Sequence, residues 1–231
     1  MTEDGAEASA GSLLSSQRAY YERRAPDYSS LTKPSDRNTA GLLHAEVARM
    51  LIDELRPGGD VLELACGPGM FTRELARHAR TLTAVDASAS MLARNRSEVS
   101  DSRIRYVEAD LFAWEPDRAY DTVFFGFWLS HVPPTFFRQF WALLRECLAP
   151  GGRVAFVDED DRGAAFEEVR LVEGVPTARR TLSDGTQFDI VKVYWEPAEL
   201  QRRLTELGFD IGIRRVGETF MYGVGTYGVG T

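Results

Sequence analysis

The sequence predicts one α/β domain built on a doubly wound, mostly parallel sheet with helices on both faces. Short apolar segments alternate with helical segments between residues 57 and 158, and this alternation is typical of a parallel sheet with right-handed crossovers. The 231 residues can bury one large core. No linker-like segment divides them. We therefore expect a single domain over residues 12–231, after a disordered leader over residues 1–11.

The N-terminal part of this domain, residues 12–56, is predicted to be helical. Residues 12–28 have a helical pattern until Pro26 interrupts it. Residues 38–55 form a clear amphipathic pattern with leucines, Val47 and Met50 on one face. The segment RPGGD then breaks the chain before the predicted core of residues 57–158.

The core is expected to contain five strands with helices between them. The strands are predicted at 61–65, 82–86, 104–110, 120–127 and 151–158. The helices are predicted at 70–79, 88–99 and 134–148. Ser88 has the side chain to cap the second of these helices.

The alternation ends after Asp158. Residues 159–196 are interpreted as an insertion that contains a hairpin turning at Asp184-Gly185. The remaining residues, 197–231, are predicted to form a helix with Pro197 in its first turn and then two final strands, which bring the sheet to seven.

Composition excludes several classes of protein. A net charge of −8 argues against a broad phosphate-binding surface, so nucleic acid is not an expected partner. No apolar run is long enough to cross a membrane, and the N-terminus lacks a signal-peptide pattern. Two cysteines without metal-site spacing predict neither a disulfide framework nor a metal centre. We expect a cytoplasmic protein, and the sequence leaves its oligomeric state open, a homodimer included.

The stretch VLELACGPGMFT, residues 61–72, predicts a cofactor site. A glycine turn between a strand and a helix exposes backbone N–H groups to a ligand. Glu63 would repel a pyrophosphate, and Thr72 stands where a dinucleotide site needs its third glycine. A carboxylate beside this turn instead favours a cofactor with a positive charge and no phosphate.

The stretch resembles the first motif of the class I S-adenosylmethionine-dependent methyltransferases. Glu63, Gly67 and Gly69 match that motif, whereas Ala65 replaces its first glycine. The resemblance extends over about residues 18–225, through YYERRAPDY, LTAVDAS, VEADLFAW, YDTVFFGFWLSHVPP and LAPGGRVAFVD. A doubly wound fold that binds another ligand is the alternative.

The resemblance implies S-adenosyl-L-methionine as cofactor, S-adenosyl-L-homocysteine as product, no metal, an antiparallel last strand and a lid of N-terminal helices. It implies that Asp86 binds the ribose hydroxyls, Asp110 the adenine amino group, and the N–H of Leu111 a ring nitrogen. The complete set of predicted cofactor-binding residues is Tyr21, Tyr28, Glu63, Ala65, Gly67, Gly69, Asp86, Ala87, Met91, Asp110, Leu111 and Phe127.

His131 follows the fourth predicted strand, where this fold presents side chains to the reacting methyl group. With an ordinary pKa it suits a general base, but a histidine that only pins the loop explains the same position. Tyr21 is the second catalytic candidate. Trp128, His131 and Asp158 are the candidate substrate-binding residues, and Glu159, Asp160 and Asp161 are interpreted as a solvated loop. His44, His78 and Cys66 are interpreted as structural, surface or loop residues.

The predicted function is methyl transfer to a small-molecule acceptor, with oxygen favoured as the methylated atom. Two alternatives remain open at this point. One is a protein that binds the cofactor without transferring its methyl group, and the other is a methyltransferase that acts on a macromolecule.

Overall fold

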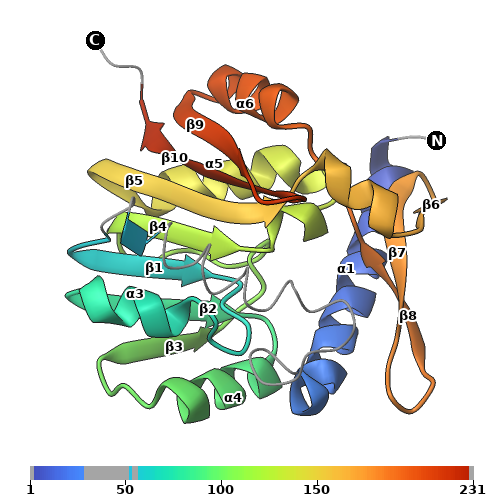
Figure 1. Cartoon of the computed structure of the whole chain (residues 1–231), viewed down its shortest axis with the longest axis horizontal. Helices are drawn as coiled ribbons and strands as arrows, with labels where there is room; N and C mark the ends of the chain where they lie inside the picture. The colour runs from blue at the N-terminus through green and yellow to red at the C-terminus, as the bar shows by residue number, and fades with distance from the viewer. Residues whose placement is uncertain (1–2, 29–51, 54–56, 229–231) are drawn as a thin grey trace.

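The computed structural model describes residues 3–28, 52–53 and 57–228 (Figure 1). Its centre is a seven-stranded sheet in the order β3-β2-β1-β4-β5-β10-β9. The strands are β1 (Asp60–Leu64), β2 (Thr81–Asp86), β3 (Ile104–Glu108), β4 (Tyr120–Gly126), β5 (Leu148–Glu159), β9 (Phe209–Val216) and β10 (Phe220–Tyr227). β1 to β5 pair in parallel, whereas β10 is antiparallel to both β5 and β9. The predicted fold is confirmed, including the antiparallel last strand.

Helices cover both faces of the sheet. Successive residues of the central strands therefore pack alternately into two different cores. Phe124 of β4 packs in a core that includes Leu75 of α3 (Thr72–His78) and Leu92 of α4 (Ala89–Val99). The next residue, Phe125, packs in the opposite core with Phe140 of α5 (Phe137–Cys147). That core also contains residues of α6 (Pro197–Glu206). Central strands buried on both faces read as continuous apolar runs, as β4 does.

The predicted helix boundaries in the core hold with small shifts. The Oγ of Ser88 accepts a hydrogen bond from the N–H of Met91 at 3.1 Å and caps α4. Pro197 stands in the first turn of α6, as expected. Residues 134–136 form a short 3₁₀ helix, η3, immediately before α5.

The first helix, α1 (Glu3–Arg24), begins well before residue 12. The expectation of a disordered leader is therefore wrong for residues 3–11. Alanine has the highest helix propensity, and this segment contains Ala8 and Ala10. Ala10 also packs in the core with α5. The helix ends before Pro26, where a 3₁₀ turn, η1 (Ala25–Asp27), follows.

The predicted helix over residues 38–55 lies outside the described residues except for Ile52 and Asp53, which are helical. Among the described residues, no helix combines the length and apolar character that a membrane crossing requires.

The insertion contains a 3₁₀ helix, η4 (Asp161–Phe166), and a separate three-stranded antiparallel sheet. Its strands are β6 (Val169–Val172), β7 (Val175–Thr181) and β8 (Gln187–Val191), in the order β6-β7-β8. The predicted hairpin is β7-β8, and Gly185 in its turn has a φ of 85°. α1 runs alongside β8 (Figure 1), and the Oγ of Ser16 donates to the carbonyl of Asp189 at 3.2 Å.

Candidate active site

A cavity of about 990 Å³ lies where the carboxyl ends of β1, β2 and β4 face α1 and the insertion. The arrowheads of β1 and β4 point toward α1 (Figure 1). Strand order reverses between β1 and β4, and ligands of doubly wound sheets bind at such a switch point. The position of the cavity therefore agrees with the cofactor site that the sequence predicts.

The glycine turn after β1 forms one wall of this cavity. Ala65, Gly67 and Gly69 all have a positive φ, at 49°, 50° and 99°. A Cβ on Gly69 would lie 2.7 Å from the Oδ1 of Asn95, so this position has no room for a side chain. The amide of Asn95 donates to the carbonyl of Gly67 at 3.2 Å and to the Oγ1 of Thr72 at 2.8 Å. α4 thus holds the turn in place from behind.

Asp86, at the end of β2, joins this turn to α4. Its carboxylate accepts hydrogen bonds from the N–H of Gly67 at 2.8 Å and the N–H of Ser88 at 2.9 Å. Burial raises the pKa of Asp86, and these two hydrogen bonds act in the opposite direction. The same carboxylate lines the cavity, so a ligand can reach it.

Glu63 lies beneath the turn rather than in the cavity wall. Its side chain is buried and accepts a hydrogen bond from the Oγ1 of Thr72 at 2.6 Å. Burial raises the pKa of Glu63 to about 8. The structure therefore places this carboxyl group where it supports the turn, without direct access to the cavity.

Most of the other predicted site residues are brought together. Those that line the cavity are Tyr21, Tyr28, Ala65, Gly67, Asp86, Ala87, Met91, Asp110, Leu111, Phe127, Trp128 and His131. Glu63, Gly69 and Asp158 are not part of its wall. Asp158 is buried and accepts hydrogen bonds from the N–H groups of Ser130 and Glu159, at 2.9 and 2.8 Å. It fixes the loop that carries His131 instead of facing a ligand.

The cavity wall formed by residues 65–113 is acidic. Asp86, Glu108 and Asp110 contribute to it, whereas no Lys or Arg from these described residues does. Such a wall favours a positively charged ligand over one with phosphates.

Tyr21 of α1 and His131 meet at the other end of the cavity. His131 lies in the 3₁₀ helix η2 (Leu129–His131) after β4. Its Nδ1 lies 2.8 Å from the carbonyl oxygen of Val191, and its Nε2 lies 3.1 Å from the Oη of Tyr21. A carbonyl only accepts, so Nδ1 carries the proton, and Nε2 of the neutral ring accepts from Tyr21.

The environment of His131 lowers its pKa to about 3. Burial is the largest cause, and the positive charges of Lys192 and Arg180 act in the same direction. The expectation of an ordinary histidine pKa is therefore wrong. The pKa of Tyr21 is raised well above its usual range, mainly by burial, so both groups stay neutral near pH 7.

The insertion adds cavity residues that the sequence did not single out. Lys192 lines the cavity, is nearly buried, and pairs with Glu159. Its Nζ also donates to the Oγ of Ser130 at 3.3 Å. Arg180 lines the cavity too and pairs with Glu167. A hairpin pattern in the sequence does not reveal which residues reach a cavity formed by distant segments.

The loop DEDD was misread in part. Glu159 lines the cavity, and Asp160 is fully buried, so neither belongs to a solvated loop. His78 is exposed at the end of α3, and Cys66 is a buried free thiol; both agree with the structural or surface roles expected for them. His44 lies outside the described residues.

Residues of α1 other than Tyr21 were also missed. Glu22 accepts hydrogen bonds from the Oγ of Ser88 at 2.6 Å and the N–H of Ser90 at 3.2 Å. The amide of Gln17 donates to the carbonyl of His131 and accepts from the N–H of Val191, both at 3.2 Å. α1 thus connects α4 to β8 across the cavity. In the parts of the chain that the structure describes, no group of three or more His, Cys, Asp or Glu could hold a metal ion.

The fold and this cavity define an α/β enzyme-like domain with a cofactor site at the switch point of its sheet. Residues 61–152 match the methyltransferase-domain family. The chain is 39% identical to DhpI in a structure described as its SAH complex, with a TM-score of 0.78 over 94% of this chain and 97% of that one. A second structure, described as a DhpI-SAM-HEP complex, matches with the same identity and a TM-score of 0.77.

Two curated relatives are also methyltransferases by name. A ubiquinone biosynthesis O-methyltransferase of Xanthomonas euvesicatoria is 34% identical over 164 residues, which cover 67% of this chain and 64% of that protein. An uncharacterized methyltransferase of Mycobacterium tuberculosis is 34% identical over 110 residues, 46% of this chain, and the match spans only 55% of the length of that relative.

The chain belongs to the class I S-adenosylmethionine-dependent methyltransferases. The predicted family is thus confirmed. The predicted cofactor is also confirmed, because the two similar DhpI structures are described as complexes with SAH and SAM.

Proposed function

We propose that this chain transfers the methyl group of S-adenosylmethionine to an oxygen atom of a small acceptor that carries a negative charge. The cofactor supplies a methyl group made electrophilic by its sulfonium. The acceptor oxygen attacks that methyl carbon in line with the C–S bond, which breaks as the new O–C bond forms. The electron pair of the broken bond stays on sulfur and neutralises it.

The acidic wall of the cavity supports the cofactor half of this proposal. Asp86 would accept hydrogen bonds from the ribose hydroxyls, and the turn at Gly67 gives the backbone close access to the ligand. Asp110 and Leu111 line the same cavity, and we propose that they contact the adenine. Glu63 would act indirectly, by holding Thr72 and the turn. Among the described residues 65–113, the cavity wall has no Lys or Arg that would oppose a positively charged ligand, although Arg18 of α1 approaches Asp110 at 4.0 Å.

The observation that carries the acceptor half is Lys192 at the His131 end of the cavity. An ammonium has three N–H donors, and Glu159 and Ser130 use two of them among the described residues. Lys192 and Arg180 both line this end of the cavity, together with Glu159. An anionic acceptor could form charge-assisted hydrogen bonds with these two basic side chains, and this is the reason for proposing a negative charge on it.

Trp128 supports oxygen as the bound atom. Trp128 lines the cavity, and its buried Nε1–H finds no acceptor among the described residues. An indole N–H only donates, so an acceptor atom of a bound ligand, such as an oxygen, would satisfy it. The printed name of the Xanthomonas relative, an O-methyltransferase, agrees with transfer to oxygen.

An anionic oxygen needs no enzymic base. A base with a pKa near 3 is poorly matched to neutral pH, since general bases work best near the operating pH. We therefore favour His131 as the group that orients Tyr21, rather than as the proton acceptor. Tyr21 would position the acceptor by contact with its ring, because its single hydroxyl proton is donated to His131. α1 and the insertion would exclude water from the acceptor.

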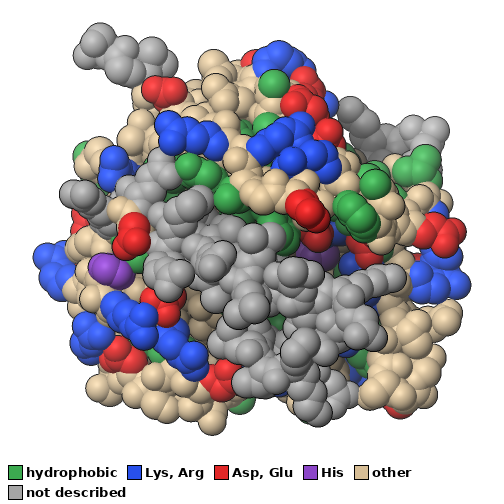
Figure 2. All heavy atoms as spheres, viewed as in Figure 1, with side chains coloured by type: hydrophobic (Ala, Val, Ile, Leu, Met, Phe, Trp, Pro, Cys, Tyr) green, Lys and Arg blue, Asp and Glu red, His purple; other side chains and the backbone are tan. Residues whose placement is uncertain are grey.

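An acceptor that is a small molecule, rather than a nucleic acid, stays part of the proposal. On the described part of the face drawn in Figure 2, basic and acidic side chains are interspersed, without a broad basic surface. A cytoplasmic location also stays a proposal. A protein that binds the cofactor without transferring its methyl group is the competing function.

Release of S-adenosylhomocysteine tests the proposal. The purified chain is supplied with S-adenosylmethionine and a panel of carboxylic acids, phosphorus and sulfur oxyacids, phenols and amines. We expect turnover with members of the oxyacid groups, and a loss of that turnover in Lys192→Met with cofactor binding retained. Tight cofactor binding without turnover on any acceptor would favour the competing function.

A further inference from the structure

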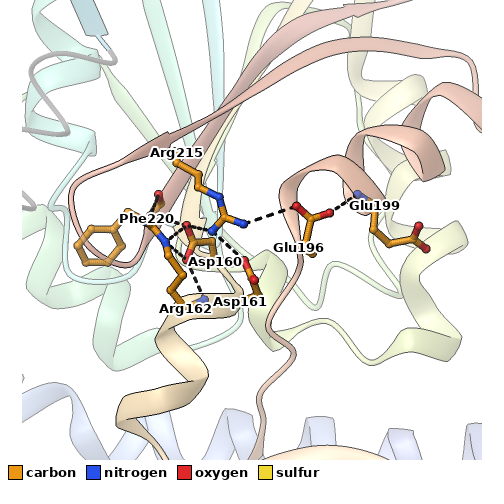
Figure 3. A network of polar contacts seen from close by, with 7 residues as sticks. All are labelled: Asp160, Asp161, Arg162, Glu196, Glu199, Arg215 and Phe220. Carbon is orange, nitrogen blue, oxygen red and sulfur yellow. Dashed lines mark hydrogen bonds and ion pairs between the residues drawn. The ribbon is translucent and has the colours of Figure 1, made fainter.

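Asp160 is a fully buried carboxylate outside the cavity and holds two arginines (Figure 3). Arg162 donates to it from its Nη2 at 2.6 Å and from its Nε at 3.0 Å. Arg215 of β9 donates to it from its Nη1 at 2.8 Å. A buried carboxylate without such partners is strongly unfavourable, so these contacts determine where the start of the insertion lies.

The same cluster also holds the end of the insertion. Asp160 pairs with Trp195 in an isolated parallel bridge, and the N–H of Asp161 donates to the carbonyl of Trp195 at 3.1 Å. Arg215 approaches Asp161 at 2.8 Å and Glu196, just before α6, at 3.5 Å. Figure 3 shows Arg215 between Asp160, Asp161 and Glu196.

The sheet holds the cluster from its other side. The N–H of Asp160 donates to the carbonyl of Thr219 at 2.7 Å, and Arg162 donates to the carbonyl of Phe220 at 3.4 Å. Arg215 itself comes from β9. The two ends of the insertion are thus fixed to each other and to β9 and β10.

Both ends lead directly into the acceptor end of the cavity. Glu159, the partner of Lys192, immediately precedes Asp160. At the other end, the N–H of Val193 donates to the carbonyl of Ser130 at 2.8 Å, next to His131. A shift of the cluster would therefore move Glu159, Lys192 and the carbonyl of Val191 that bonds to His131.

We propose that Arg215 is a positioning residue for the acceptor site. It acts through Asp160, Asp161 and Glu196, which keep both ends of the insertion together and so hold Lys192 and Glu159 in place. It touches neither acceptor nor cofactor. The effect on catalysis rests on the proposed function, whereas the effect on the insertion does not.

Hydrogen exchange tests the structural part without an acceptor. In Arg215→Ala, we expect the amides of residues 187–193 to exchange about tenfold faster, while β1 and β2 exchange as in the parent. Arg215→Lys keeps the charge and is expected to restore part of the protection. Arg202→Ala, which removes exposed ion pairs of α6, is the matched control and should leave residues 187–193 unchanged.

The functional part is measured on the same variants. Calorimetry should give cofactor affinities within about twofold of the parent for all three. With the best acceptor of the panel, Arg215→Ala should raise the acceptor KM about tenfold, and Arg215→Lys should raise it less. Unchanged exchange at 187–193, or faster exchange spread evenly over the sheet, would overturn the proposal. An absence of turnover in the parent would count against the proposed function alone, because the exchange result is independent of it.

Discussion

The Oη of Tyr21 donates a hydrogen bond to the Nε2 of His131 across 3.1 Å. The donor is identified by the other ring nitrogen, which lies 2.8 Å from the carbonyl of Val191 and must carry the proton. α1, the loop after β4 and the insertion therefore meet through one imidazole ring.

The first prediction concerns this pair. If His131 orients Tyr21, then Tyr21→Phe and His131→Ala should each lower turnover by roughly 3- to 10-fold, the equivalent of one hydrogen bond. The double variant should be little worse than either single variant, because both remove the same interaction. Steady-state kinetics on the three proteins checks this. A loss of about 10²–10⁴-fold in His131→Ala alone, with Tyr21→Phe near normal, would instead identify His131 as a general base.

The pH dependence of the rate is the second prediction. Burial and two cations lower the pKa of His131 to about 3, so the ring is already neutral at any pH above about 5. With an acceptor that is ionised throughout, kcat should be constant from about pH 6 to about pH 9. A rate that rises tenfold per pH unit below about pH 6.5 would show an ordinary histidine base and contradict this account.

Asp86 should control cofactor affinity. Asp86→Asn keeps the size of the side chain and removes its charge, so the hydrogen bonds to a ribose would lose their charge-assisted character. We expect the affinity for S-adenosylmethionine to fall about 10- to 100-fold, corresponding to roughly 1.4 to 2.7 kcal/mol. Calorimetry gives the value. Asp117→Asn, an exposed carboxylate that pairs with Arg105, is the control, and an equal affinity of the two variants would remove Asp86 from the site.

Glu63 should make the cofactor-free protein less stable as pH rises. Its pKa is about 8 in the folded state, against a usual value of 4.5. Between these values the folded state binds more protons than the unfolded state, so the free energy of unfolding falls as pH rises through this window. The upper limit is roughly 1.4 kcal/mol for each unit of difference.

Glu63→Gln cannot titrate and should flatten this dependence. Denaturant unfolding of both proteins between about pH 5 and about pH 8 measures the difference. Glu146→Gln, an exposed position on α5, should keep the slope of the parent. A slope that stays the same in Glu63→Gln would mean that Glu63 is ionised in the folded protein.

Much of the core was predictable because each local pattern there agrees with the fold. The apolar run of β4 is buried on both faces, and the turn at Gly67 and Gly69 needs a positive φ that glycine adopts easily. Asp86 and Asp110 could be placed because strand ends of a parallel sheet meet at one edge. These features depend on residues close together in the chain.

The acceptor end was harder to predict because distant segments build it. Tyr21 comes from α1, His131 from the loop after β4, and Lys192 from the insertion, directly after β8. No local sequence pattern predicts that these three residues meet. The burial of Asp160 has the same origin, since its partner Arg215 is far away in the chain. The pKa of His131 is lowered by burial and by Lys192 and Arg180, which are distant in the chain, so the sequence around His131 does not predict it.

The most direct test of the central claim is to locate the transferred methyl group. S-adenosylmethionine with an isotopically labelled methyl group is incubated with the chain and the best oxyacid acceptor, and the product is examined by NMR and mass spectrometry. The account predicts a methyl ester, with the label on an acceptor oxygen, and no such product from Lys192→Met. A label on nitrogen or carbon, or a Lys192→Met variant as active as the parent, would contradict it.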